Sequence, residues 1–468
     1  MLELKDFEKI EELQTPFWYY DLDLLRRTAD EVAKLSQKYG IGVHYALKAN
    51  IEPRILQIIS GKGFGADCVS GNEVIYAVEH GFRPETVVFA GVGKTDREIS
   101  RAIDLGIGCF HVESLMELEV IDAIASAKGV RVNAAVRINP NIDAHTHKYV
   151  TTGLEENKFG ISRHEFDSVI ELLKSCKSVD FKGLHFHVGS QILDVREVYS
   201  EECRMASEIV DYFESHGLVV RDIDLGGGLG VNYTDPDSEP IPDFETWFST
   251  INDNLKRRPD QTVSLEPGRS MVAQCGSLIS RVVFVKHGEH KSFLILDAGM
   301  NDLIRPALYG SYHHIENLTA EAQAGSDSHF QTMSGLGAQR EPVMKDNLRS
   351  HPSVMEVEGG RDVCCQAASG LGAQREPVMK DNLRSHSSVM EVEEGRDVCY
   401  RYDVTGPVCE SSDVWGTDRQ LPESHRGDML AIRSAGAYGS VMSSRYNLRD
   451  IAPAVFSDEL VPVPSPLY

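Results

Sequence analysis

The sequence predicts an α/β protein in which a (β/α)8 barrel is followed by a β domain. The first observation is that eight short apolar runs alternate with amphipathic stretches between about residues 40 and 270. The second is that these runs end in polar residues or glycines, as strands do at the functional face of a barrel. The third is a change after about residue 280 to strand-rich sequence with glycine and proline turns. A doubly wound open sheet is the alternative.

The eight apolar runs have the length expected of buried strands. They are VHYALK (43–48), GADCV (65–69), TVVFA (86–90), IGCFHV (107–112), VNAAVRI (132–138), FKGLHFHV (181–188), DIDLGGG (222–228) and TVSLEPG (262–268). Helical patterns such as GNEVIYAVEHGF and RMASEIVDYFESHG lie between them. Strands that alternate with helices in this way favour parallel pairing, and eight of them are enough to close a barrel.

The remaining sequence predicts a second domain, and 468 residues are enough for it. The run RVVFVKHGEHKSFLILDAG predicts a two-strand hairpin, and YRYDVTGPVCESSD and DMLAIRSAGAYGS predict further strands. The strand-like piece PFWYYDLDLL is expected to join them. We therefore expect an N-terminal strand within residues 1–30, a barrel over 31–278 and a β domain over 279–468.

One part of the predicted β domain is duplicated. Residues Ser334–Cys364 recur as Ser369–Cys399, 35 residues later, with differences only at Pro352/Ser387 and Gly359/Glu394. Two copies are too few for a solenoid, and each copy is poor in large apolar residues. We interpret residues 320–399 as a surface insertion that contains a tandem duplication. A partner-binding loop is the alternative.

Composition and charge narrow the possible functions. Hydrophobic residues make up 41% and charged residues 25%, the balance of a globular protein. The net charge of −24 disfavours nucleic acid and anionic membranes as partners. The N-terminus has no apolar signal core, and no apolar run approaches the roughly 20 residues of a membrane span. The nine cysteines form no C-x-x-C pair, so we expect reduced thiols, a cytoplasmic protein and no metal site.

The candidate chemistry centres on Lys48, at the end of a run that reads as a buried strand. Such a lysine is either an ion-pair partner or a reactive amine. Three other strand ends add an imidazole and a hydroxyl in HFHVGSQ (185–191), a glycine run in DLGGGLG (224–230), and a carboxylate with a guanidinium in EPGRS (266–270). An amine, a phosphate cradle, an acid and a flat ring are the parts that pyridoxal phosphate requires.

These motifs, with DAGMNDLIRPALYGSYHHI, GPVCESSD and GAYG, resemble the fold-type III pyridoxal-phosphate decarboxylases. The resemblance covers roughly residues 12–320 and 400–455 and implies an alanine-racemase-like barrel with a C-terminal β domain. Family members usually join HHI to the CES segment by a short connection. The sequence departs from that pattern, because about 80 residues intervene here.

The resemblance implies which residues bind pyridoxal 5'-phosphate. Lys48 would form the Schiff base, His187 would stack on the ring, and Glu266 would face the pyridinium nitrogen. The residues expected around the phosphate are Ser190, Gly227, Gly228, Gly268 and Arg269. Tyr438 would touch both the cofactor and the substrate.

The resemblance also implies substrate ligands and a dimer. The expected substrate-binding residues are Arg269, Arg305, Tyr309, Glu410 and Tyr438. Cys409 resembles the proton donor of the family. Because the CES segment of the family reaches into the site of a second subunit, we expect a homodimer with shared active sites.

Within the family, the match is closest to the members that convert meso-2,6-diaminopimelate into L-lysine and CO2, the last step of lysine biosynthesis. Arginines for a distal carboxylate and an acid for a distal ammonium suit that substrate. One alternative is a related decarboxylase of the ornithine, arginine or carboxynorspermidine type. The other is a catalytically silent cofactor-binding homologue, against which the presence of Lys48 and Cys409 argues.

Overall fold

The computed structural model describes residues 7, 9–139, 158–324 and 399–466. The duplicated segment therefore lies outside the described residues, apart from Cys399 at its end. Within the described residues, no helix is long and apolar enough to cross a membrane.

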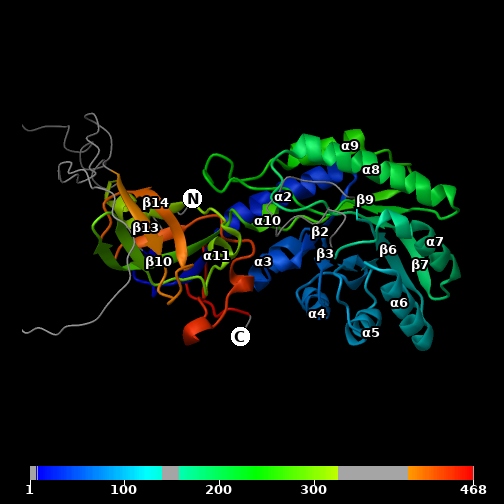
Figure 1. Ribbon diagram of the computed structural model, residues 1–468, viewed down its shortest axis with the longest axis horizontal. Helices are drawn as coiled ribbons and strands as arrows, with labels where there is room; N and C mark the ends of the chain where they lie inside the picture. The colour runs from blue at the N-terminus through cyan, green and yellow to red at the C-terminus, as the bar shows by residue number, and fades with distance from the viewer. Residues whose placement is uncertain (1–6, 8, 140–157, 325–398, 467–468) are drawn as a thin grey trace, which may run out of the picture. The chain divides into compact units, whose positions relative to one another are not determined.

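Eight parallel strands close into a barrel, which confirms the predicted fold class and shows that the open-sheet alternative is wrong (Figure 1). The barrel strands are β2 (Gly42–Ala46), β3 (Gly65–Cys68), β4 (Val87–Phe89), β5 (Cys109–Val112), β6 (Val132–Arg137), β7 (Val179–His185), β8 (Asp222–Asp224) and β9 (Thr262–Leu265). Each strand pairs with the next in sequence, and β9 closes on β2 with Leu265 opposite Val43. All C-terminal strand ends therefore meet at one face of the barrel.

Helices precede, connect and follow the barrel strands. They are α2 (Leu22–Tyr39), α3 (Pro53–Ser60), α4 (Gly71–Glu79), α5 (Asp96–Leu105), α6 (Leu115–Lys128), α7 (Phe166–Ser175), α8 (Val195–Ser215), α9 (Phe244–Asn254) and the short α10 (Arg269–Val272). Several begin at a side chain that accepts hydrogen bonds from the first turn. Asp21 accepts from the backbone of Asp23 and Leu24, and Thr95 forms a capping box with Glu98.

A second, eight-stranded sheet contains β1 (Phe17–Tyr20), β10 (Gly276–His287), β11 (Ser292–Leu296), β12 (Ile315–Asn317), β13 (Tyr400–Thr405), β14 (Val414–Leu421), β15 (Met429–Ile432) and β16 (Ala454–Phe456). The predicted hairpin is present as β10 and β11, paired antiparallel. The N-terminal β1 lies between β10 and β16. The domain boundaries at residues 30 and 278 stay predictions.

Apolar side chains on both faces of this sheet are buried. Along β1, Phe17 and Tyr19 pack with one apolar cluster, whereas Trp18 and Tyr20 belong to the main core, which also contains the barrel side chains. This alternation follows from the two-residue period of a strand. It ties the start of the chain to the β sheet before α2 begins the barrel.

Two strand ends differ from the prediction in ways that shape the candidate site. Lys48 lies on a 3-10 turn, η1 (Leu47–Ala49), directly after β2 rather than within it. Strand β8 ends at Asp224 because Gly226 has a φ of 64°, a left-handed conformation that favours glycine. At Gly227, an added Cβ would lie 2.2 Å from the carbonyl oxygen of Glu266, so the glycine run packs directly against the end of β9.

Candidate active site

Lys48 lies at the C-terminal face of the barrel beside Asp67. Its Nζ donates a hydrogen bond to Asp67 Oδ2 at 2.7 Å, and the Lys48 side chain is 37% exposed while Asp67 is fully buried. Burial alone would lower the pKa of Lys48, but Asp67, with Tyr438 and Glu266, raises it above its ordinary value. Lys48 therefore forms an ion pair, one of the two roles that the sequence left open, and its side chain is still partly exposed.

Glu266 follows β9 and is buried within the barrel. Its Oε2 lies 3.2 Å from His185 Nε2 and its Oε1 lies 3.5 Å from His111 Nδ1, yet Oε1 has no hydrogen-bond partner among the described residues. Burial raises the pKa of Glu266 well above its ordinary range, and Asp224 and Asp67 raise it further. Burial therefore disfavours the charged form of this carboxyl group, and one of its oxygens is available to a ligand.

His111, His185 and Glu266 place three donor atoms within 4.8 Å of one another, which raises the question of a metal site. The two imidazole rings stack, with centroids 4.2 Å apart and planes 28° from parallel. Two imidazoles that bind one metal ion each direct a ring nitrogen at that ion, so their rings do not stack face to face. The stack is suited to supporting Glu266 instead. Burial lowers the pKa of both histidines, to about 4 for His185, so both rings are neutral.

His187 and the glycine run form the next part of the site. The backbone N–H of Gly227 donates to His187 Nδ1 at 3.2 Å, which places the ring proton on Nε2 and fixes the ring orientation. Burial lowers the pKa of His187 well below its ordinary value, and Arg137 and Lys48 lower it further. His187 is therefore a neutral, flat ring next to the Lys48 amine.

Arg269 connects the strand-end motifs. Its Nη2 and Nε donate to Ser190 Oγ at 2.9 and 3.3 Å, and its Nη1 donates to the Tyr233 hydroxyl at 2.6 Å. The guanidinium carbon lies 4.9 Å from the centre of the Tyr438 ring. Tyr438 is anchored by its own N–H, which donates to the carbonyl of Ala49 at 2.8 Å, one residue after Lys48. The motifs around residues 48, 190, 269 and 438 thus meet at one place.

Arg305, from α11 (Arg305–Tyr309), brings a second guanidinium to this place. Its carbon lies 5.8 Å from the Tyr309 ring centre and 5.9 Å from that of Tyr438. Arg305 is buried, and its Nε has no hydrogen-bond partner in the described part of the chain. Burial lowers its pKa, and the neighbouring Arg269 lowers it further. Neither arginine forms an ion pair with a described carboxylate, so an anion would be stabilised here.

Gly228 and Gly268, the remaining predicted phosphate neighbours, are both closely packed. Gly228 has a φ of 117°, and an added Cβ would lie 2.6 Å from the carbonyl oxygen of Gly189. At Gly268, an added Cβ would lie 3.5 Å from the Tyr438 hydroxyl. Gly228 therefore borders the segment after His187, and Gly268 borders Tyr438, which contacts Arg269.

Cys409 and Glu410 are not brought to the barrel mouth of their own chain. Both are exposed on the loop between β13 and β14. Glu410 Oε1 accepts a hydrogen bond from Tyr446 at 2.6 Å, and Asp413 stabilises the loop by accepting from the backbone of Met300 and Val408. The remaining predicted site residues lie in or beside the cluster around Lys48 and Arg269.

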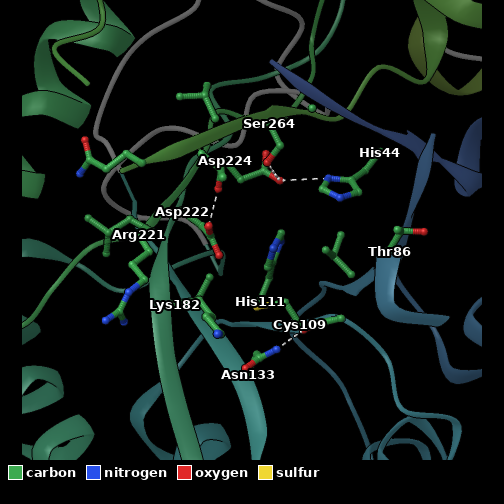
Figure 2. Close-up of a pocket in the computed structure, with 18 of the residues that line it drawn as sticks. His44, Thr86, Cys109, His111, Asn133, Lys182, Arg221, Asp222, Asp224 and Ser264 are labelled. Carbon is green, nitrogen blue, oxygen red and sulfur yellow. Dashed lines mark hydrogen bonds and ion pairs between the residues drawn. The ribbon is translucent and has the colours of Figure 1, made fainter. Parts of the chain in front are cut away.

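A cavity of about 580 Å³ opens at the opposite end of the barrel, where the strands begin (Figure 2). Its lining includes His44, His111 and Asp224, and Figure 2 shows His44 and Asp224 facing each other, with Nδ1 and Oδ2 3.6 Å apart. None of the predicted site residues lines this cavity. Barrel enzymes carry their chemistry at the C-terminal face, so we place the candidate site there.

Sequence reasoning gave no role to Tyr233, His185 or His111. His185 contacts Glu266, and His111 stacks on His185. Their positions near the ends of predicted strands were the sequence feature that could have indicated a role at the site. Tyr233 lies in an irregular loop after β8, where no periodicity indicates which way a side chain points. Asp67, on β3, was also not among the predicted site residues, and it is the hydrogen-bond partner of Lys48.

The residues present fit pyridoxal phosphate. The accessible Lys48 amine suits an aldehyde, and the two guanidiniums with Ser190 suit anionic groups. The buried Glu266 oxygen without a hydrogen-bond partner suits a ring nitrogen. Their chemistry therefore matches the parts of this cofactor.

Comparison with protein families gives two matches. Residues 23–273 match the pyridoxal binding domain of the pyridoxal-dependent decarboxylases, and residues 354–436 match the C-terminal sheet domain of the same family. The first match alone covers more than half of the chain and contains all eight barrel strands.

Individual relatives agree with the family match. The chain is 44% identical to a diaminopimelate decarboxylase of Bacteroides thetaiotaomicron, over 97% of this chain and 98% of the relative. It is similar in structure to the Helicobacter pylori diaminopimelate decarboxylase complexed with L-lysine, with a TM-score of 0.76, 33% identity and coverage of 98% and 95% of the two chains. It is also similar in structure to the diaminopimelate decarboxylase of M. jannaschii, with a TM-score of 0.76, 28% identity and coverage of 98% and 91% of the two chains.

Proposed function

The chain belongs to the pyridoxal-dependent decarboxylase family, and from that premise we propose that it releases CO2 from meso-2,6-diaminopimelate and forms L-lysine. The relative that shares 44% identity bears the name of this activity, and the H. pylori structure contains L-lysine. The reaction class is that of a carboxy-lyase.

The observation that carries the substrate assignment is the pair of buried guanidiniums. Arg269 and Arg305 lie beside the same tyrosine rings and have no described carboxylate partner. Diaminopimelate has a second carboxylate at its distal end, which would supply the missing negative charge. The distal ends of ornithine and arginine are cations, which two guanidiniums would repel. The site therefore favours the substrate with a distal carboxylate.

Lys48 and Asp67 would act where the cofactor attaches. Pyridoxal phosphate, when bound, would supply an aldehyde that bonds to an amine and a ring that accepts the electron pair left on the substrate carbon when CO2 departs. Asp67 Oδ2, 2.7 Å from Lys48 Nζ, holds the ammonium in place. The same oxygen can accept the proton that the amine must lose before it can react as a nucleophile.

Glu266, His187 and the phosphate residues would orient the ring. Glu266 is buried in the barrel with Oε1 available, so its carboxylate would pair with the protonated ring nitrogen. His187, fixed by the Gly227 N–H, would lie against the ring face. Arg269 would serve both the phosphate and the distal carboxylate of the substrate. Its Nε and Nη2, which hydrogen-bond to Ser190, would face the phosphate with Gly227, Gly228 and Gly268, and its Nη1, which hydrogen-bonds to Tyr233, would face the distal carboxylate. Tyr309 and Tyr438 would contact the substrate beside Arg305.

We also propose a homodimer with shared active sites. Its support is that Cys409 and Glu410 are exposed on their own chain and are not among the residues that contact the cluster around Lys48 and Arg269. The β13–β14 loop of a second subunit would bring Cys409 as the proton donor and Glu410 as a ligand for the distal ammonium. The cytoplasmic location stays a prediction, which cell fractionation would test.

The test of the substrate assignment is release of CO2 from meso-diaminopimelate, ornithine and arginine, each measured with the cofactor-loaded protein. We expect release from diaminopimelate only. Release from ornithine or arginine at a comparable kcat/KM would show that the guanidinium pair does not select a distal carboxylate.

A further inference from the structure

Tyr233 lies between the two guanidiniums of the site. Its hydroxyl oxygen is 2.6 Å from Arg269 Nη1 and 3.5 Å from Arg305 Nη2. Its ring centre is 5.9 Å from the guanidinium carbon of Arg269 and 5.7 Å from that of Arg305. In the described part of the chain, this hydroxyl is the hydrogen-bonding group that both arginines share.

The loop that carries Tyr233 is held on both sides. The Gln191 side chain forms two hydrogen bonds with the backbone of Val231, at 2.7 and 3.2 Å, and Gln274 donates to the carbonyl of Asn232 at 3.1 Å. The Tyr233 ring meets His313 edge to face, with centroids 5.1 Å apart. These contacts restrict the ring, so its hydroxyl is placed before any ligand binds.

The electrostatics support an attractive role for the hydroxyl oxygen. Burial would raise the pKa of the Tyr233 phenol, but Arg269 and Arg305 lower it below its ordinary value. Two like charges repel each other when they are brought together out of water. An oxygen dipole directed at both of them offsets part of that repulsion. Arg305 otherwise has only Ser311 Oγ at 3.3 Å as a described hydrogen-bond acceptor.

We propose that Tyr233 is a positioning residue that sets the preference for a distal carboxylate, because its hydroxyl holds Arg305 beside Arg269 in the arrangement that receives this carboxylate. The proposal rests on the proposed function, since it concerns how the same site selects its substrate. It assigns Tyr233 to substrate binding and leaves bond cleavage to other residues. Removal of the hydroxyl should therefore raise KM and leave kcat nearly unchanged.

Two ligands separate this role from a general effect on the site. L-Lysine, formed by loss of one carboxylate from diaminopimelate, retains the carboxylate at its distal centre. 1,5-Diaminopentane has the same chain length and both amines but no carboxylate. If Tyr233 acts through the two arginines, only the binding of L-lysine depends on its hydroxyl.

The experiment compares the cofactor-loaded wild type, Tyr233→Phe and the control Tyr212→Phe, which removes a hydroxyl on α8 that hydrogen-bonds to Asp167. Calorimetry gives the Kd of each protein for L-lysine and 1,5-diaminopentane. We expect Tyr233→Phe to weaken L-lysine binding about 10-fold, with the KM for diaminopimelate rising by a similar factor, because a hydrogen bond to a charged group is lost. Binding of 1,5-diaminopentane should not change, and Tyr212→Phe should match the wild type.

Three results would overturn the proposal. The first is an unchanged Kd for L-lysine in Tyr233→Phe, and the second is equal weakening of both ligands, which would indicate a general structural role. The third is a Tyr233→Phe protein that fails to bind the cofactor, because the hydroxyl would then serve the phosphate side of Arg269. A wild type without activity on diaminopimelate would instead contradict the proposed function, so the two failures are distinguishable.

Discussion

Replacement of Arg305 by methionine should separate substrate binding from stability. Arg305 is 5% exposed, its Nε has no described partner, and its contacts through Nη2 are long, at 3.3 and 3.5 Å. The guanidinium therefore gains little from the fold, while its desolvation is costly. Methionine fills a similar volume without the charge. The thermal midpoint of the cofactor-free protein should stay the same or rise.

The substrate should lose one charge-assisted contact in this variant. Such a contact is worth about 1.5–3 kcal/mol, which corresponds to a KM that is about 10- to 100-fold higher for diaminopimelate. Steady-state kinetics with CO2 detection and a thermal melt of the same preparation measure the two effects. Arg305→Lys is the control, because it retains the charge but loses the planar guanidinium. Its KM should lie between those of the wild type and Arg305→Met. An unchanged KM, or a melt several degrees lower, would refute the reasoning.

Further changes test the shared site and a buried acid. Cys409→Ala should reduce turnover and leave the cofactor absorbance intact. Mixing this variant with Lys48→Ala should restore about a quarter of wild-type activity, because half of the dimers then contain one intact site. No recovery of activity would contradict shared active sites. Burial raises the pKa of Glu202, whose carboxyl oxygens have no described partner, and Asp224 raises it further. The contribution of Glu202 to the free energy of unfolding is therefore fully present below its unfolded pKa. As the pH rises from the unfolded pKa to the folded pKa, the free energy of unfolding falls by about 1.4 kcal/mol per pH unit. Glu202→Gln should raise the thermal midpoint above that of wild type at pH 7, and by a smaller amount at pH 4. The control Glu197→Gln, at an exposed position, should show no such dependence on pH. An equal shift for Glu202→Gln at both pH values would contradict the raised pKa of Glu202.

The barrel could be predicted because each of its strands is a short apolar run that ends at a polar residue or glycine. That pattern places Lys48, His187 and Glu266 at one face, and the structure has them there. Arg305 and Tyr438 lie far along the chain in the β domain. Only their motifs, not any periodicity, indicated that they join the same cluster.

Other parts of the site could not be predicted, for physical reasons. Tyr233 follows the glycine run in a loop, and the direction of its side chain depends on contacts with Gln191 and Gln274 that are distant in sequence. The raised pKa of Glu266 depends on its burial and on Asp224 and Asp67, from two other strands. Such effects arise only when separate strands meet in space.

The most direct test of the account is to locate the amine that binds the cofactor. The protein is incubated with pyridoxal phosphate, reduced with borohydride, digested and mapped by mass spectrometry. We expect a single major label on Lys48 and its loss in Lys48→Ala. A label on a different lysine, or none with excess cofactor, would contradict the placement of the active site at this face of the barrel.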